Sequence, residues 1–273
     1  MTKLFEGLDL SRWCDENGLY RLFDVDPHTC NPAQKLEKGI YETVDPHNRV
    51  PFPPEFDDLA RLHFLARTRK VTTVLEIGAG RSTVVFADAL RRNRSEFGDY
   101  VSANLRRANP FEVHSLEQSS EWVQVCRESL PESLASFVHF TCAPVQMTTW
   151  NGRACTLYQQ IPDICPDLIY LDGPDQFSVE GDIHGISTRS ADRLPMSADL
   201  LLLEPFLLPG TLIAVDGRTA NARFLKNNFQ RPWRYAHHVD ADLHTFELVE
   251  PPLGKLNERQ IRFCLGEQAL VSA

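Results

Sequence analysis

Short apolar runs that end on an acidic residue recur along the middle of the chain. Four of them are rich in β-branched residues, and each stops on a carboxylate: VTTVLE at Glu76, EVHSLE at Glu117, DLIYLD at Asp172 and TLIAVD at Asp216. A fifth run, residues 137–142, fits the same rhythm but ends without an acid. Runs of this length and composition predict buried strands.

Segments with helix-like patterning separate these predicted strands. They cover residues 82–92, 119–130 and 197–207, and an amphipathic helix is expected before the first strand, over about 54–69. Alternation of short strands with helices is typical of an α/β fold. We therefore expect a doubly wound, mainly parallel, seven-stranded sheet.

One polar region precedes this pattern of strands and helices, and two others interrupt it. Residues 1–53, rich in Pro, His, Asp and aromatic residues, predict an N-terminal arm with loops, and residues 54–273 a single domain. Residues 92–110 are expected to loop out of the first crossover. Residues 173–197 directly follow Asp172, and a loop of this length beside a strand end is more often a functional lid than a linker.

Composition narrows the function classes. The chain has 273 residues, 42% of them hydrophobic, as is usual for a soluble globular protein. The net charge of −9 argues against a nucleic-acid partner, because phosphate binding needs a positive field. The longest apolar candidate, residues 200–203, stops at Glu204, far short of a membrane span. The first residues lack the apolar segment of a secretion signal, so a cytoplasmic location is expected.

The stretch VLEIGAGRST, residues 74–83, joins the first predicted strand to its helix. Gly78 and Gly80 would let the backbone turn sharply and approach a ligand closely, and Ser82 or Thr83 could cap the helix. In a parallel sheet the strand ends meet at one edge, where ligands bind. Carboxylates gathered there would repel one another unless a ligand with hydroxyl donors and a positive charge compensates.

The glycine spacing bears on the choice of ligand. A nicotinamide-dinucleotide site needs a third glycine, whereas Thr83 stands at that position, and an acid about 20 residues further on. Glu117 lies well beyond that distance. Both departures count against a dinucleotide.

Four segments together resemble the class I S-adenosylmethionine-dependent methyltransferases, most of all the branch that methylates small molecules and sugars. They are LEIGAGRST, HSLEQSSEW, PDLIYLDGP and LLPGTLIAVDG, and the resemblance covers about residues 71–249. It implies a Rossmann-like methyltransferase fold and an enzyme that transfers a methyl group from S-adenosylmethionine to a small-molecule acceptor, expected to be a hydroxyl. The alternatives are an NAD(P)-dependent oxidoreductase and a non-catalytic nucleotide-binding protein of the same fold.

The resemblance also implies roles for single residues. The methionine part of the cofactor would be lined by Glu76, Gly78, Ala79, Gly80 and Ser82. The ribose hydroxyls would bind Glu117, with Gln118 beside it, and the adenine would lie between Ala143 and Pro144. Asp172 would stand by the methionine amine or at the reaction centre.

The proton acceptor is expected on the loop after Asp172. His184 is the first candidate for a general base, because an imidazole with a pKa near neutrality can accept a hydroxyl proton. His237, His238 and His244, on the expected sixth and seventh strands, are weaker candidates. The N-terminal arm would help to shape the acceptor pocket or would pack between copies of the chain, which leaves homo-oligomerisation open.

A divalent cation is the remaining open question. Asp172 and Asp216, with Asp175 or Asn221, would offer the hard oxygen ligands that suit Mg²⁺. The metal-dependent methyltransferases that this branch resembles carry a further acid or amide directly after the fifth-strand aspartate, where this chain has Gly217. The metal-free alternative is therefore favoured.

Overall fold

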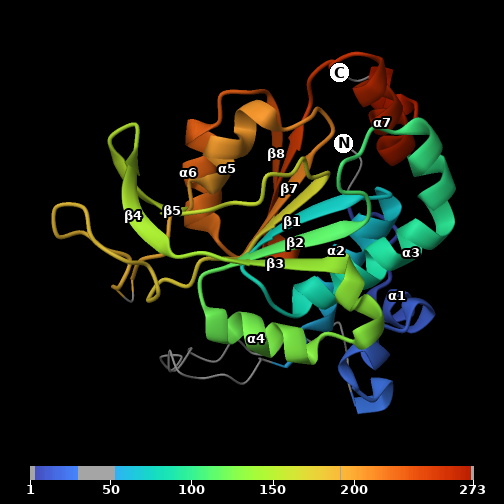
Figure 1. Cartoon of the computed structure of the whole chain (residues 1–273), viewed down its shortest axis with the longest axis horizontal. Helices are drawn as coiled ribbons and strands as arrows, with labels where there is room; N and C mark the ends of the chain where they lie inside the picture. The colour runs from blue at the N-terminus through green and yellow to red at the C-terminus, as the bar shows by residue number, and fades with distance from the viewer. Residues whose placement is uncertain (1–3, 30–52, 191, 272–273) are drawn as a thin grey trace.

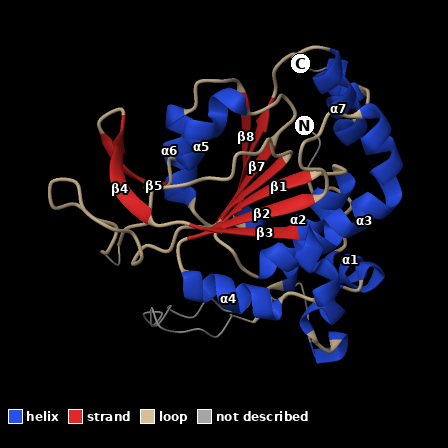
Figure 2. Ribbon diagram, in the orientation of Figure 1, coloured by secondary structure: helices blue, strands red, loops and turns tan. Residues whose placement is uncertain are grey.

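The computed structural model describes residues 4–29, 53–190 and 192–271. At its centre lies a seven-stranded sheet with helices on both faces (Figures 1 and 2). The strand order is β3-β2-β1-β6-β7-β9-β8. The strands are β1 Thr73–Ile77, β2 Glu112–Glu117, β3 Val138–Cys142, β6 Leu168–Leu171, β7 Leu212–Asp216, β8 Trp233–His238 and β9 Leu243–Leu248. In this sheet only β9 runs antiparallel to its neighbours, which confirms the expected mainly parallel sheet.

The described residues form eight α-helices in addition to the sheet. They are α1 Leu10–Asn17, α2 Phe56–Thr68, α3 Arg81–Asn104, α4 Ser120–Ser129, α5 Asp199–Leu203, α6 Thr219–Asn228, α7 Lys255–Leu265 and α8 Gln268–Val271. Short 3₁₀ turns occupy Leu19–Phe23, Pro27–Thr29, Glu132–Phe137, Glu204–Phe206 and Val239–Ala241. No described helix has both the length and the apolar character that a bilayer crossing requires.

The central strands are apolar on both sides because both sides are packed. In β1, Val74 packs into the core that α2 and α3 share, while its neighbour Leu75 packs into the core of α5 and α6. Successive side chains of a strand point to opposite faces, so a strand covered on both faces is a continuous apolar run. This explains why these strands are recognisable in the sequence.

Helix α3 is longer than expected. It continues to Asn104, so the prediction that residues 92–110 loop out was wrong for most of that segment. Three residues spaced four apart, Asn93, Phe97 and Val101, face inward from the polar stretch. Asn93 is fully buried and donates to the carbonyl oxygens of Ala66 and Val71. Because the polar residue Asn93 occupies an inward position that is usually apolar, the sequence did not show the helical periodicity of this segment.

A hairpin replaces a helix between β3 and β6. Its strands, β4 Val145–Trp150 and β5 Arg153–Tyr158, form a separate two-stranded sheet that projects from the end of β3 (Figure 1). Asn151 and Gly152 form its turn, with φ values of 49° and 75°. Positive φ at both positions is the mark of a type I′ turn, which Asn-Gly strongly favours.

Two segments outside the sheet pack on neighbouring elements. Residues 4–29 contain α1, which packs on α2, where Trp13 Nε1 donates to His63 Nδ1 over 3.1 Å. Residues 30–52 of the expected arm lie outside the described residues. The expected lid, 173–197, contains no helix in its described part and touches the hairpin through β-bridges, Gln146 with Glu180 and Thr156 with Ser197.

Candidate cofactor site at the carboxyl edge of the sheet

Glu76 organises the turn between β1 and α3. Its side chain is fully buried and accepts hydrogen bonds from Ser82 Oγ and Thr83 Oγ1, each at 2.5 Å, and from Ser115 Oγ. Burial raises the pKa of Glu76 to about 7, against the opposing effect of the three hydroxyl donors. All three donors belong to the protein, and two of them are in the first turn of α3. The Glu76 carboxylate therefore holds that turn against the end of β1.

The two glycines of the turn differ in what surrounds them. Gly78 has φ of 97°, and a Cβ added there would lie 2.7 Å from the backbone nitrogen of Gly173. The absence of a side chain at Gly78 therefore serves the close approach of two backbones. A Cβ on Gly80 would meet only Ser82 Oγ, at 3.8 Å, and otherwise open space. Of the two, Gly80 faces the space that a ligand would use.

Glu117 ends β2 directly beside this turn. Its carboxylate accepts from the backbone N–H groups of Ala79 at 3.2 Å, Gln118 at 2.9 Å and Ser119 at 3.0 Å. The residue is only 4% exposed, and burial raises its pKa to about 7 despite these three donors. A buried carboxylate held by backbone amides is thus aimed at the turn that Gly80 leaves open.

The edge beyond Glu117 is lined by Ala143 and Gln118, as the sequence indicated, and by Trp122 and Tyr158, to which it assigned no role. Ala143, buried, donates its N–H to the carbonyl oxygen of Glu117 over 2.9 Å, which joins the ends of β2 and β3. Gln118 Oε1 accepts from the hydroxyl of Tyr158 at 3.0 Å. Trp122 Nε1 donates to the carbonyl oxygen of Ala79 over 2.7 Å. The Asn-Gly turn was the available signal for the hairpin that carries Tyr158.

Asp172 follows β6 and lies beside an arginine. Arg218 Nε is 3.6 Å from Asp172 Oδ1, and the same guanidinium donates to the carbonyl oxygens of Asp172 and, over 3.1 Å, Pro174. The Asp172 side chain is half exposed. Arg218 stands two residues after Asp216, outside every motif that the sequence indicated, so only the fold brings it to the strand edge.

Asp216 and the other proposed metal ligands have protein partners. Asp216 Oδ2 accepts from the hydroxyl of Tyr170 at 2.9 Å. Asn221 is fully buried and bonds Ser197 through both atoms of its amide. Asp175 Oδ1 accepts from the backbone of its own turn. With a guanidinium already beside Asp172, this donor set does not fit a divalent cation.

The candidate bases lie apart from this edge or within packed contacts. His184 is exposed at the tip of a turn with φ of 54°, and no described contact joins it to Asp172 or Glu117. His244 is buried, and its two ring nitrogens lie 2.9 Å from the hydroxyls of Thr219 and Tyr235. Burial lowers the pKa of His244 to about 4, so it is neutral at physiological pH.

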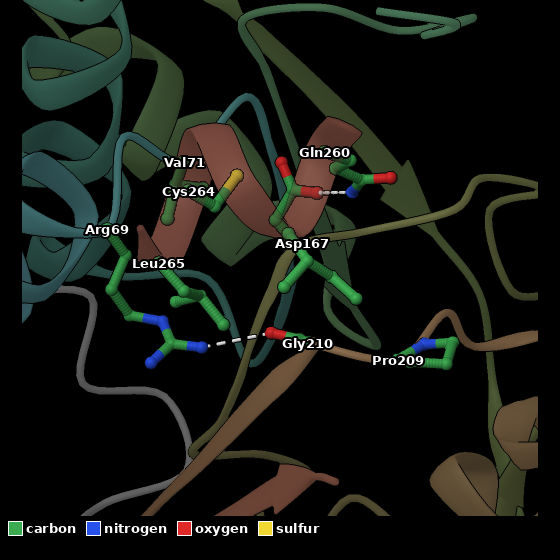
Figure 3. Close-up of a pocket in the computed structure, with 9 residues that line it drawn as sticks. Arg69, Val71, Asp167, Pro209, Gly210, Gln260, Cys264 and Leu265 are labelled. Atoms are coloured by element: carbon green, nitrogen blue, oxygen red, sulfur yellow. Dashed lines mark hydrogen bonds between the residues drawn. The ribbon is translucent and has the colours of Figure 1, made fainter. Parts of the chain in front are cut away.

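A small cavity lies at the opposite edge of the sheet (Figure 3). Figure 3 shows Asp167 bonded to Gln260, and Arg69 bonded to the carbonyl oxygen of Gly210. Asp167 directly precedes β6, so this cavity is at the amino ends of the strands. Its volume of about 10 Å³ holds no more than one water molecule. A cavity of this size cannot hold a cofactor, so the candidate site is at the carboxyl edge of the sheet.

The strand order and the single antiparallel strand decide the fold. It is the Rossmann-like methyltransferase fold. No protein-family model matches the sequence, and no curated protein matches it.

Several solved methyltransferases are similar to the chain. A putative O-methyltransferase from Klebsiella pneumoniae is 18% identical, with a TM-score of 0.38 over 88% of each chain. A Podospora anserina methyltransferase with SAH bound is 14% identical, with a TM-score of 0.41 over 72% of this chain and 82% of that one. A Bacillus cereus O-methyltransferase in complex with SAH is 12% identical, with a TM-score of 0.36 over 89% and 92%. Similarity this low says nothing about activity, which we infer from the residues of this chain.

Proposed function

We propose that this protein is an enzyme that transfers the methyl group of S-adenosylmethionine to a small-molecule acceptor, through a hydroxyl group. One observation carries the proposal. The buried carboxylate of Glu117 is fixed by backbone amides beside the turn where Gly80 leaves open space.

The chemistry of Glu117 fits a ribose. A carboxylate only accepts hydrogen bonds, so it suits a ligand that presents two neighbouring hydroxyl donors. Burial of this group is unfavourable in the ligand-free protein, as its pKa of about 7 indicates. Hydroxyl donors would stabilise the ionised form and offset that cost. Gln118, Ala143 and Tyr158 lie next to it on the side proposed for adenine.

The charges at the edge fit a cationic cofactor. Burial is the main cause of the raised pKa of Glu76, and the negative charge of Asp172 raises it further. The two carboxylates therefore repel each other. S-adenosylmethionine supplies an activated methyl group on a sulfonium, whose positive charge would relieve this repulsion. We assign the methionine part to the turn from Gly78 to Gly80, with Glu76 and Ser82 bracing it from beneath.

The protein's own task is to hold donor and acceptor in line and to remove one proton. We place Asp172 at the reaction centre, where Arg218 fixes its backbone and its carboxylate. The proton acceptor is Asp172 itself, or His184 if the 173–197 loop brings it to the acceptor, since no described contact joins His184 to Asp172 in this structure. The metal-free mechanism needs one of the two. The arm and this loop would shape the acceptor pocket. The net charge of −9 disfavours a nucleic-acid partner. A cytoplasmic location is part of the proposal, and homo-oligomerisation stays open.

Calorimetric titration separates this proposal from its alternatives. S-adenosylhomocysteine should bind one site per chain, and NAD or NADP should not. Preferential binding of a nicotinamide dinucleotide would overturn the proposal in favour of an oxidoreductase. Incubation of the protein and tritiated S-adenosylmethionine with a panel of hydroxylated small molecules then tests catalysis. Binding without label transfer to any member, and without slow hydrolysis of the donor, would indicate a non-catalytic nucleotide-binding protein.

A further inference from the structure

A second cluster of polar side chains lies near the amino ends of strands β2 and β3. Glu112 and His114 are two residues apart on β2, so their side chains share one face of the sheet. His139 is the register partner of His114 on β3. The two imidazole rings stack with their centroids 4.9 Å apart. All three residues are near the amino ends of their strands, away from Glu117 at the end of β2.

This part of the sheet is accessible. β3 is the edge strand, and the hairpin that follows it projects away instead of returning as a helix across this face (Figure 1). The side chain of His139 is 51% exposed, Glu112 28% and His114 12%. Solvent and ions can therefore reach the three groups, while the backbone beneath them is held by the sheet.

The side-chain nitrogen and oxygen atoms of the three residues lie close to one another. Glu112 Oε2 lies 2.9 Å from His114 Nε2 and 3.6 Å from His139 Nε2. One ligand atom from each of the three residues lies within 4.8 Å of those of the other two. Tetrahedral Zn²⁺ with bonds of about 2.0–2.1 Å separates its ligand atoms by roughly 3.4 Å. The 3.6 Å separation is close to this value, and the 2.9 Å one would have to lengthen by about 0.5 Å on binding.

The donor set selects the kind of metal. Two imidazoles and one carboxylate, with a fourth position left for water, form an established zinc-binding combination. Imidazole ligands suit zinc, copper, iron and nickel, whereas Mg²⁺ and Ca²⁺ prefer oxygen ligands. Asn109 Nδ2 donates to Glu112 Oε2 over 2.9 Å, an outer contact of the kind that orients a ligating carboxylate. Among the described residues, no other such group of three comes this close.

We propose that Glu112, His114 and His139 bind a divalent transition-metal ion, Zn²⁺ by preference, which clamps edge strand β3 to β2. The ion is coordinated by His114 Nε2, His139 Nε2 and Glu112 Oε2, and water completes the tetrahedron. On binding, the proton on each coordinating nitrogen moves to Nδ1 or to solvent. The site is independent of the proposed methyl transfer, because its ligands belong to the opposite ends of the strands.

The test uses the full chain without a histidine tag, stripped with EDTA and dialysed free of it. Calorimetry with zinc chloride should show one site that His139→Ala and His114→Ala each weaken by at least roughly 100-fold, as expected when a ligand rather than an outer contact is lost. Cobalt should give the intense visible absorption of a tetrahedral site. Zinc should raise the melting temperature of the wild type and leave that of His139→Ala unchanged, while magnesium should affect neither.

Two variants control for other zinc ligands. His28→Ala removes an exposed histidine outside the sheet, and Cys142→Ser removes the exposed thiol at the far end of β3. Both should bind zinc like the wild type. Unchanged affinity for S-adenosylhomocysteine in His139→Ala shows that the variant is folded. Zinc binding that survives loss of both His114 and His139, or that disappears with Cys142, would overturn the proposal.

Discussion

Gly78 and Gly173 face each other with no side chain between them, so that the turn after β1 and the turn after β6 touch through backbone atoms alone. A Cβ on either glycine would come within 3.0 Å of the other's backbone. Backbone cannot swing aside as a long side chain can. The contact therefore fixes the spacing between two turns of the proposed cofactor site.

Substitution of the two glycines of the β1 turn should have different effects. Gly78→Ala should lower the melting temperature, because its Cβ collides with Gly173 and its φ of 97° disfavours a side chain. Gly80→Ala has no such clash and an extended backbone, so it should melt like the wild type yet bind S-adenosylhomocysteine more weakly. Thermal denaturation and calorimetry measure the two effects. Full affinity in Gly80→Ala would remove that position from the ligand site.

Loss of the Glu117 carboxylate should weaken cofactor binding. Hydrogen bonds to charged groups contribute roughly 1.5–3 kcal/mol, so Glu117→Ala should bind S-adenosylhomocysteine roughly 10- to 100-fold more weakly. Glu132→Ala, an exposed acid before β3, is the matched control and should bind normally. Equal affinities of a folded Glu117→Ala and the wild type would contradict the assignment of the ribose to Glu117.

The same interaction should make binding depend on pH. The pKa of Glu117 in the free protein is raised to about 7 by burial, and hydroxyl donors would lower it in the complex. Affinity is then highest above pH 7 and falls as the pH drops below 7, because protonated Glu117 must lose its proton to bind. Calorimetry across this range, in buffers of different ionisation enthalpy, should show proton release in the wild type. The release should be smaller in Glu117→Gln.

Glu76 should make the protein less stable at neutral than at acidic pH. Its pKa is raised by burial from 4.5 to about 7, so its contribution is fully present below pH 4.5 and is lost as the pH rises to about 7. Glu76→Gln does not titrate, and its amide can still bond the neighbouring hydroxyls. Its stability relative to wild type should therefore increase with pH across this range, by up to roughly 1.4 kcal/mol per unit. Urea denaturation at several pH values measures this difference, and a constant difference would contradict the burial of an ionisable Glu76.

Turnover should survive removal of divalent cations. Arg218 already provides a positive charge beside Asp172, and Asp216 is bonded to Tyr170. Dialysis against EDTA should therefore leave the rate of methyl transfer unchanged, and His184→Ala should reduce it by roughly 100-fold or more if that residue is the base. If Asp172 is the base instead, Asp172→Asn should cause that loss and His184→Ala should not.

Arg218 should be required for full turnover. Arg218→Ala should lower turnover, since the backbone and carboxylate of Asp172 lose their partner, and Arg218→Lys should restore it only in part, because a single ammonium cannot reproduce the contacts of a guanidinium. Activity that EDTA abolishes and magnesium restores in the wild type would show that Asp172 and Asp216 bind a metal after all.

Sequence alone determined the sheet and the positions of its acids. The strands around Val74 and Ile213 are short apolar runs because they are packed on both faces, a local property that is visible in the residues. Glu117 and Asp216 end their strands as expected, and Asp172 directly follows its strand. The first strand does not stop at Glu76 as expected but continues to Ile77. Parallel strands bring their carboxyl ends to one edge, so these positions alone indicate a ligand site at that edge.

Tertiary structure decided which groups these residues meet. Gly78 was expected to make room for a ligand, yet it faces Gly173, nearly a hundred residues away in the chain. Arg218 reaches Asp172 only because β6 and β7 are adjacent in the sheet. The inward face of α3 includes a buried asparagine whose partners lie in another helix and the loop after it. Burial and pairing depend on what the fold places opposite a side chain, and a one-dimensional pattern of apolar and polar positions does not contain that information.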